Sequence, residues 1–153
     1  MNALELKIPP LVVTLVLAIA MWLLSRAMPF AAAGGALSVA MAIALALIGG
    51  GIGLAGILAF RRSRTTANPV RPQNASALVT AGVYRITRNP MYLGILLALA
   101  GWALFLFNPW SIIGPVLFVA YITRFQIVPE ERALLSLFGE RYVAYRARVR
   151  RWL

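Results

Sequence analysis

The chain has 153 residues, of which 61% are hydrophobic and only 12% are charged. A domain of this size cannot bury so many apolar side chains in its own core, so lipid must cover them and the composition predicts an integral membrane protein. The net charge is +11, but the arginines lie beside apolar segments, which indicates contact with lipid head groups rather than with nucleic acid.

The first two predicted transmembrane helices cover residues 11–28 and 36–60. Apolar segments of 18 or more residues are candidates for helices that cross the hydrocarbon core of a bilayer. Within the second segment, Gly49 and Gly53 form a GxxxG pattern. Since glycines allow two helix backbones to approach closely in lipid, this pattern predicts a helix-packing face.

The third and fourth predicted transmembrane helices cover residues 91–107 and 110–128. Only Asn108 and Pro109 separate them, so we expect an antiparallel helical hairpin. At 1.5 Å per residue the third segment reaches about 26 Å, slightly less than the thickness of the hydrocarbon core. The four segments together predict an all-α fold in which residues 1–153 form one membrane domain.

The segment 129–153 predicts a C-terminal amphipathic helix that lies in the membrane interface. Its apolar residues recur at steps of three and four, with arginines between them. Gly139 is expected to break or cap this helix. The apolar positions are Leu134, Leu135, Phe138, Tyr142, Tyr145, Val149 and Trp152.

Arginines are distributed unevenly between the two sides of the predicted membrane domain. The loop 61–90 and the tail 129–153 each contain six, whereas the turns 29–35 and 108–109 contain none. Because cytoplasmic loops carry an excess of Lys and Arg, we expect a multi-pass protein whose two termini and loop 61–90 are cytoplasmic.

Two polar clusters, residues 78–94 and 124–131, lie at the cytoplasmic end of the predicted hairpin. Together they would place arginines, an amide, two phenols and a carboxylate pair beside apolar walls. The chain has no His or Cys, which excludes the common zinc sites and the Cys–His and Ser–His nucleophiles, and no metal is expected. S-adenosylmethionine has the matching mixture of ammonium, carboxylate and aromatic groups. Alternatively, the arginines only anchor helix ends in the interface.

Several spaced motifs occur within these clusters and the tail. In chain order they are Gly82-Val83-Tyr84, the run RNPMYLG at residues 88–94, Glu130-Glu131, Phe138-Gly139, Tyr142 and Tyr145. In this order and spacing, residues 76–153 resemble the isoprenylcysteine carboxyl methyltransferase family and its phospholipid methyltransferase relatives.

The resemblance implies that this half of the chain binds S-adenosylmethionine. Arg88 and Asn89 would hold the methionine end of the cofactor, and Gly94 would leave room for it. The cofactor-binding residues that the resemblance implies are Ser76, Ala77, Leu78, Val79, Tyr84, Arg88, Asn89, Pro90, Met91, Tyr92 and Glu130.

Two positions depart from the family pattern. Asn89 stands where the eukaryotic pattern has histidine, and an amide can donate to a carboxylate but cannot act as a base. Gln126 stands where the prenylcysteine enzymes place a substrate-binding arginine, and Arg124 is close enough to substitute. The resemblance therefore implies Arg124 and Gln126 as substrate-binding residues. Arg124 and Glu131 are the expected catalytic residues, with Glu131, besides Glu130, available to help an amine acceptor lose its proton.

The expected function is a membrane methyltransferase that moves the sulfonium methyl group to an amphiphilic acceptor from the bilayer. The acceptor is left open as a prenylcysteine-like carboxylate, a thiol or a lipid amine. In-line methyl transfer needs alignment and desolvation more than a covalent intermediate. The alternatives are an NADPH enzyme like the sterol reductases, which resemble the same half, and a non-enzymatic membrane module with a degenerate pocket.

Overall fold

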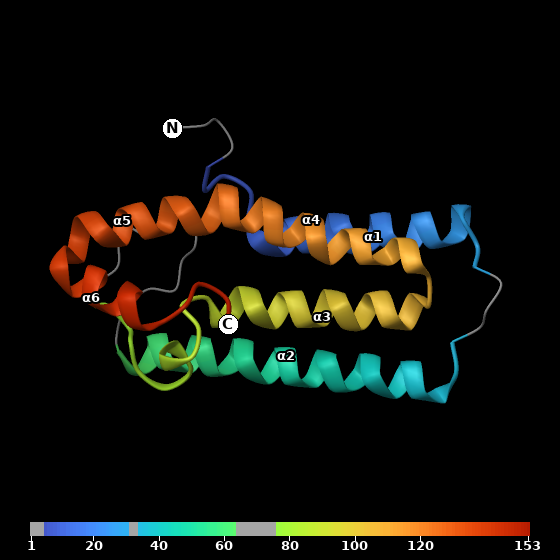
Figure 1. Ribbon diagram of the computed structural model, residues 1–153, viewed down its shortest axis with the longest axis horizontal. Coiled ribbons are helices and arrows are strands. Elements are labelled where there is room, and N and C mark those ends of the chain that lie inside the picture. The colour runs from blue at the N-terminus through green and yellow to red at the C-terminus, as the bar shows by residue number, and fades with distance from the viewer. Residues whose placement is uncertain (1–4, 31–33, 64–75) are drawn as a thin grey trace.

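The computed structural model describes residues 5–30, 34–63 and 76–153. In this part of the chain the regular elements are all helical, and the long helices run side by side along one axis (Figure 1). Three of them are long and apolar enough to cross a membrane, which together with the composition identifies an integral membrane protein. Arg64 and Arg71, two of the arginines used in the topology prediction, lie outside the described residues.

The helices α1 (Pro10–Ala27) and α2 (Ala36–Arg62) are apolar around most of their circumference. Pro10 is the first residue of α1. Proline is favoured there because an N–H at the first helical position would have no intrahelical acceptor. Only 17% of the apolar window of α1 and 11% of that of α2 are buried inside the bundle. The remaining side chains need lipid around them, as the composition requires.

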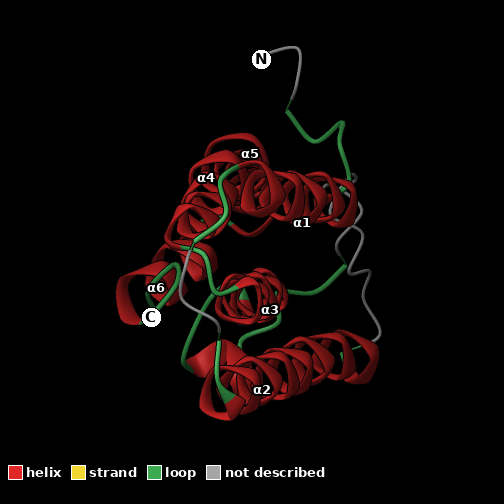
Figure 2. Ribbon diagram, turned by 90° about the vertical axis from the view of Figure 1, so that its right-hand side faces the viewer, coloured by secondary structure: helices red, strands yellow, loops and turns green. Residues whose placement is uncertain are grey.

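The helix α3 (Pro90–Leu106) lies between α2 on one side and the layer of α1 and α4 on the other, as the end-on view shows (Figure 2). The core forms on the second side, where Leu99 of α3 packs with Met21 of α1 and Phe118 of α4. With 17 residues, α3 is shorter than the three candidate spans. The fourth transmembrane crossing therefore stays a prediction.

The helices α2 and α3 approach each other closely at glycines. A Cβ atom on Gly49 would lie 2.4 Å from the carbonyl oxygen of Gly94, and a Cβ atom on Gly94 would lie 2.4 Å from the carbonyl oxygen of Gly49. The predicted packing face is confirmed at Gly49. The space at Gly94 is occupied by α2, so the expectation that this glycine makes room for a ligand is wrong.

The connection between α3 and α4 (Ile113–Ile122) is a 3-10 turn, η3 (Pro109–Ile112). The buried Asn108 side chain accepts a hydrogen bond from the backbone N–H of Trp110 at 3.0 Å and donates one to the carbonyl oxygen of Met28 at 2.7 Å. The amide thus stabilises the turn and ties it to the end of α1. The predicted antiparallel hairpin is confirmed (Figure 1).

The helix α4 does not end where the sequence pattern predicts. It continues through a π-helical turn, η4 (Thr123–Ile127), into α5 (Val128–Phe138), which gives one helical run of 30 residues from Pro109. The predicted boundary between the fourth span and the tail, at residues 128 and 129, therefore lies inside a continuous helix.

Pro129 is accommodated in this helix by the N-terminal segment. Proline has no N–H to donate to the carbonyl group four residues earlier, which here belongs to Phe125. That carbonyl oxygen instead accepts a hydrogen bond from the backbone N–H of Leu6 at 3.0 Å. Residues preceding α1 thereby complete the hydrogen bonding of the helix beside them.

The predicted tail helix consists of two helices, α5 and α6 (Glu140–Arg148). Gly139 separates them with a φ angle of 50°, a region that glycine enters at little cost, so the expected break is confirmed. After α6 the chain returns to the start of α3, where Thr87 and Arg150 form an isolated parallel bridge. Trp152 packs against the core cluster and anchors this returning segment.

Candidate functional site

The helices α5 and α6 and the start of α3 meet at one end of the bundle (Figure 1), and polar contacts join these three segments. The 3-10 turn η2 (Gly82–Arg85) leads into α3 and begins at Gly82, whose φ angle is 61°. Asn89 is the residue before Pro90, the first residue of α3. Backbone N–H groups in such a first turn have no intrahelical partner and favour an anionic group near them.

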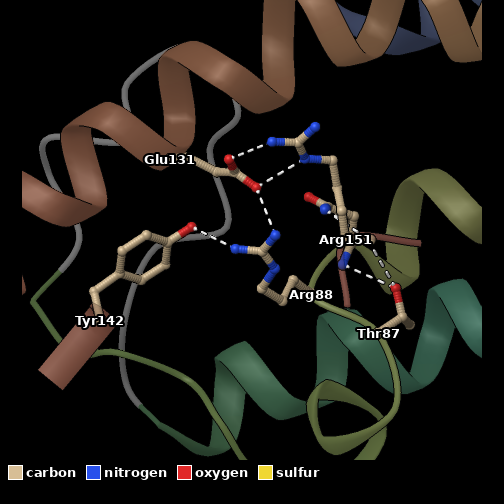
Figure 3. A network of polar contacts seen from close by, with 6 residues as sticks. Thr87, Arg88, Glu131, Tyr142 and Arg151 are labelled. Carbon is tan, nitrogen blue, oxygen red and sulfur yellow. Dashed lines mark hydrogen bonds and ion pairs between the residues drawn. The ribbon is translucent and has the colours of Figure 1, made fainter. Parts of the chain in front are cut away.

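Glu131 is the centre of a polar network (Figure 3). Its carboxylate accepts hydrogen bonds from Arg151 at 3.0 and 2.8 Å and forms an ion pair with Arg88 at 3.2 Å. Arg88 also donates to the hydroxyl group of Tyr142 at 3.4 Å. The side chains of Arg88 and Glu131 are only 10% and 12% exposed, so this ion pair is largely shielded from solvent.

The network carries more positive than negative charge, because two guanidinium groups share the carboxylate of Glu131. Burial raises the pKa of the Tyr142 phenol to about 12, so its hydroxyl group stays neutral and accepts from Arg88. The Nε atom of Arg88 is buried and has no hydrogen-bond partner among the described residues. This arrangement can accept a further anionic or hydrogen-bond-accepting group.

Asn89 contacts the returning C-terminal segment. Its Nδ2 atom donates to the carbonyl oxygen of Arg151 at 2.9 Å, and the hydroxyl group of Thr87 donates to the same oxygen at 3.2 Å. The backbone N–H of Arg88 donates to the carbonyl oxygen of Arg150 at 3.0 Å. The segment that positions the guanidinium of Arg151 therefore also fixes the amide of Asn89.

Glu130 faces α3 rather than the network around Glu131. The hydroxyl group of Tyr92 donates a hydrogen bond to Oε1 of Glu130, and Tyr92 is buried in the core cluster. Consecutive residues of an α-helix point about 100° apart, so the two neighbouring glutamates of α5 reach different partners. Together they place one carboxylate beside an apolar wall and the other among cations.

Tyr84 of η2 contacts α6 through Tyr145. The hydroxyl group of Tyr145 donates to the carbonyl oxygen of Tyr84 at 2.8 Å, and the ring of Tyr84 meets that of Phe60 edge-on with centroids 5.4 Å apart. Burial is the main cause that raises the pKa of Tyr84 well above the usual range of a phenol. Tyr84 therefore provides a neutral aromatic wall.

The other implied cofactor residues occupy two places. In the segment 76–79, Val79 is buried, Ala77 and Leu78 are half-buried and Ser76 is exposed. Pro90 and Met91 pack towards α2, since a Cβ atom on Gly56 would lie 3.1 Å from each of their Cγ atoms. Only the polar part of the motif at the start of α3 is therefore directed at the network.

Arg124 and Gln126 lie apart from the network around Glu131 and contact the N-terminal segment. Arg124 donates to Glu5 at 3.1 Å, and the buried amide of Gln126 donates to the carbonyl oxygen of Ile8 at 2.7 Å. The structure thus brings Arg88, Asn89 and Glu131 together, but joins Arg124 and Gln126 to residues before α1.

Sequence reasoning assigned no site role to four residues at this end of the bundle. Thr87, Tyr142 and Arg151 belong to the network in Figure 3, and Tyr145 contacts Tyr84. The two tyrosines belong to the spaced motifs, which was a usable signal. Arg151 is one of several arginines in the tail and carries no local signal, because its partner Glu131 precedes it by 20 residues.

The residues of this site fit an amino-acid-bearing sulfonium cofactor. Arg88, with its buried Nε atom unpartnered among the described residues, and the amide of Asn89 fit a carboxylate group. The carboxylate of Glu130 fits an ammonium group, and Tyr84 and Val79 provide apolar surface. The donor and acceptor types are therefore those that a zwitterionic ligand with an aromatic body requires.

An all-helical membrane protein with a polar site at one end of the bundle is the class that these observations define. A family model for phospholipid methyltransferases matches residues 37–141, more than half of the chain. The chain belongs to the phospholipid methyltransferase family.

The chain is also similar to several individual proteins, among them named methyltransferases. An uncharacterized protein of Haemophilus influenzae is 46% identical over 63 residues, which are 41% of this chain and all of that protein. Protein-S-isoprenylcysteine O-methyltransferases B and A of Arabidopsis thaliana are 38% and 35% identical over 61% and 65% of this chain, and over 47% and 50% of their own length. The chain thus spans about half the length of these named relatives. No solved structure gives a significant match.

Proposed function

We propose that the protein is an S-adenosylmethionine-dependent methyltransferase that acts on an amphiphilic acceptor at the cytoplasmic face of a membrane. The observation that carries this proposal is the cluster of Arg88, Asn89, Glu130 and Glu131 around the start of α3. Two arguments support the proposal: the cluster has charges that suit a zwitterionic cofactor, and the chain belongs to a family of methyltransferases. The relatives of known name act on isoprenylcysteine, as their names state.

Each residue of the cluster has a binding role in this proposal. Arg88 and Asn89 hold the carboxylate of the methionine part, and Glu130 faces its ammonium group. When bound, the cofactor supplies the electrophilic methyl group. The network of Glu131 and Arg151 holds Arg88 in place, which is the alignment that an in-line displacement requires.

The two glutamates differ in their suitability for proton transfer. Both oxygens of Glu131 are engaged by guanidinium groups, which fits the orienting role better than that of a base. Glu130 contacts a neutral phenol and is the carboxylate that can take a proton from an amine acceptor. A carboxylate or thiolate acceptor is already nucleophilic and needs no such help.

Calorimetry of the purified protein in detergent tests the proposal. S-adenosylhomocysteine is expected to bind and NADPH is not. Arg88→Gln is expected to weaken binding of the adenosyl ligand, and Arg146→Gln, an exposed arginine of α6, is the control that leaves it unchanged. Binding of NADPH without any response to the adenosyl ligand would favour a reductase and contradict the proposal.

A further inference from the structure

An apolar groove of about 580 Å³ runs along the outside of the bundle between α1 and α4. Val12, Val16 and Leu17 of α1 line one side, and Leu117 of α4 and Phe125 of η4 line the other. None of these residues belongs to the network around Glu131. Its walls are almost entirely hydrocarbon, so an alkyl chain is the chemistry that fits them.

One end of this groove is bordered by cations. The exposed Lys7 directly precedes Ile8, which lines the groove, and Arg124 directly precedes Phe125. Arg132 lies two helical turns after Arg124 on the same helix. Both arginines form ion pairs with Glu5. The side chains of Arg124 and Arg132 remain 51% and 55% exposed, so a ligand from outside can reach them.

The carboxylate of Glu5 holds the guanidinium groups of Arg124 and Arg132 close together. Its side chain is only 4% exposed and accepts from Arg124 at 3.1 Å and from Arg132 at 2.5 Å. These two guanidinium groups share one carboxylate, and the exposed Lys7 lies two residues after Glu5 in the sequence, so cations outnumber anions among these four residues. A second anionic group is therefore favoured electrostatically beside the first.

The depth of the groove matches one leaflet of a bilayer. From Phe125 at the charged end to Leu117, the helix advances about 12 Å at 1.5 Å per residue. Half of a hydrocarbon core 30 Å thick is about 15 Å. An acyl chain lying in the groove would thus reach from the level of the head groups nearly to the bilayer centre.

We propose that this groove binds an anionic phospholipid, with its phosphate group at Lys7, Arg124 and Arg132 and one acyl chain between α1 and α4. Neither the apolar groove nor the cations alone would specify this ligand. Their position end to end selects a lipid whose head group is negatively charged. The proposal concerns a lipid that stays bound to the protein, and it rests on the groove and its neighbouring cations, not on the proposed function.

The test compares two lipids with identical acyl chains on the purified, delipidated full chain. Phosphatidylglycerol is expected to bind at least tenfold more tightly than phosphatidylcholine, measured by native mass spectrometry. The double variant Arg124→Gln and Arg132→Gln is expected to lower phosphatidylglycerol affinity about 25-fold, roughly fivefold for each cation at an anionic surface. The matched control is Arg141→Gln with Arg146→Gln on α6, which is expected to change affinity less than twofold.

Two further variants separate lipid binding from folding. Glu5→Gln removes the internal anion, so it is expected to raise phosphatidylglycerol affinity about fivefold, an effect that a folding defect cannot produce. Ala120→Trp fills the groove and is expected to abolish the retention of either lipid. The proposal is wrong if the two lipids bind equally, if Glu5→Gln weakens binding, or if the control double variant loses as much affinity. It is also wrong if Ala120→Trp leaves lipid binding intact and changes only the oligomeric state, which would assign the groove to a second copy of this chain.

Discussion

Glu130 and Glu131 are neighbours in sequence, yet they make different contacts. Glu130 accepts a hydrogen bond from the buried Tyr92, whereas Glu131 is shared by two arginines. In the described part of the chain the first carboxylate contacts a neutral phenol, and the second is the anion that holds the two guanidinium groups of the network together. Substitutions that remove only the charge are therefore expected to affect different properties at the two positions.

Glu130→Gln is expected to lower the affinity for S-adenosylhomocysteine about 10- to 150-fold, the range for a lost charge-assisted hydrogen bond of roughly 1.5–3 kcal/mol. The amide oxygen of glutamine can still accept from Tyr92, so the melting temperature without ligand should change little. Glu140→Gln, on the exposed start of α6, is the control and should change neither. Early melting of Glu130→Gln with normal affinity would show that this glutamate is structural.

Glu131→Gln is expected to destabilise the protein, because Arg88 and Arg151 would lose the carboxylate that they share. Arg88 is only 10% exposed, so its charge would remain largely buried without a counter-ion. The expected loss is about 1.5–3 kcal/mol of unfolding free energy, seen as an earlier thermal transition in detergent. An unchanged transition would mean that solvent already replaces this ion pair.

At the scale of helices, the glycines of α2 permit a matched comparison of two adjacent positions. Gly49→Ala places a methyl group 2.4 Å from the carbonyl oxygen of Gly94, whereas Gly50→Ala meets nothing within 4 Å. We expect Gly49→Ala to lower the melting temperature. Gly50→Ala should raise it slightly, because alanine in a helix adds about 0.5–1 kcal/mol to the free energy of unfolding. Similar melting of the two variants would contradict the close contact between α2 and α3.

Pro129→Ala tests how the N-terminal segment is held. Alanine supplies an N–H that can donate to the carbonyl oxygen of Phe125 and so compete with the N–H of Leu6. We expect the segment before α1 to open more often, and trypsin to cleave after Lys7 several times faster. Pro109→Ala, at the opposite end of the bundle, is the control. Unchanged cleavage would mean that the contacts of Glu5 alone hold the segment.

The sequence predicts the helix positions well because prolines, arginines and glycines bound the apolar runs. The helices α1, α2 and α3 begin and end within two residues of the predicted segments. The continuation of the α4 helix through Pro129 was not predicted, because proline usually marks a first helical position. Here the hydrogen bond that proline cannot donate to Phe125 comes from Leu6, 119 positions earlier in the sequence.

The candidate site was predictable where its residues fall within the spaced motifs. Arg88, Asn89 and Glu131 come together as the hairpin prediction requires. The contacts of Arg124 with Glu5 and of Arg151 with Glu131 were not predictable, because each joins an arginine to one of several possible acids without a local pattern. Long-range ion pairs of this kind follow from the tertiary arrangement alone.

For the whole molecule, the arginine distribution predicts that both termini and the loop 61–90 are cytoplasmic. Reporter fusions at Arg64 and after Leu153 are expected to give the cytoplasmic signal, and an insertion between Asn108 and Pro109 is expected to give the opposite one. A fusion after Leu153 that reports from the far side would contradict the topology. It would also separate the tail from the loop with which it forms the polar network.

The contacts that build the polar end connect residues far apart in the sequence, which has a consequence for the order of assembly. Asn89 and Arg151 are 62 positions apart, and Arg88 and Tyr142 are 54 apart. Membrane helices satisfy their own backbone hydrogen bonds before they associate, and distant contacts form late. We therefore expect an intermediate in which the helices remain in lipid while the polar end is open. In mild denaturant, the amide hydrogen of Arg88, which donates to the carbonyl oxygen of Arg150, should then exchange before those in the middle of α3.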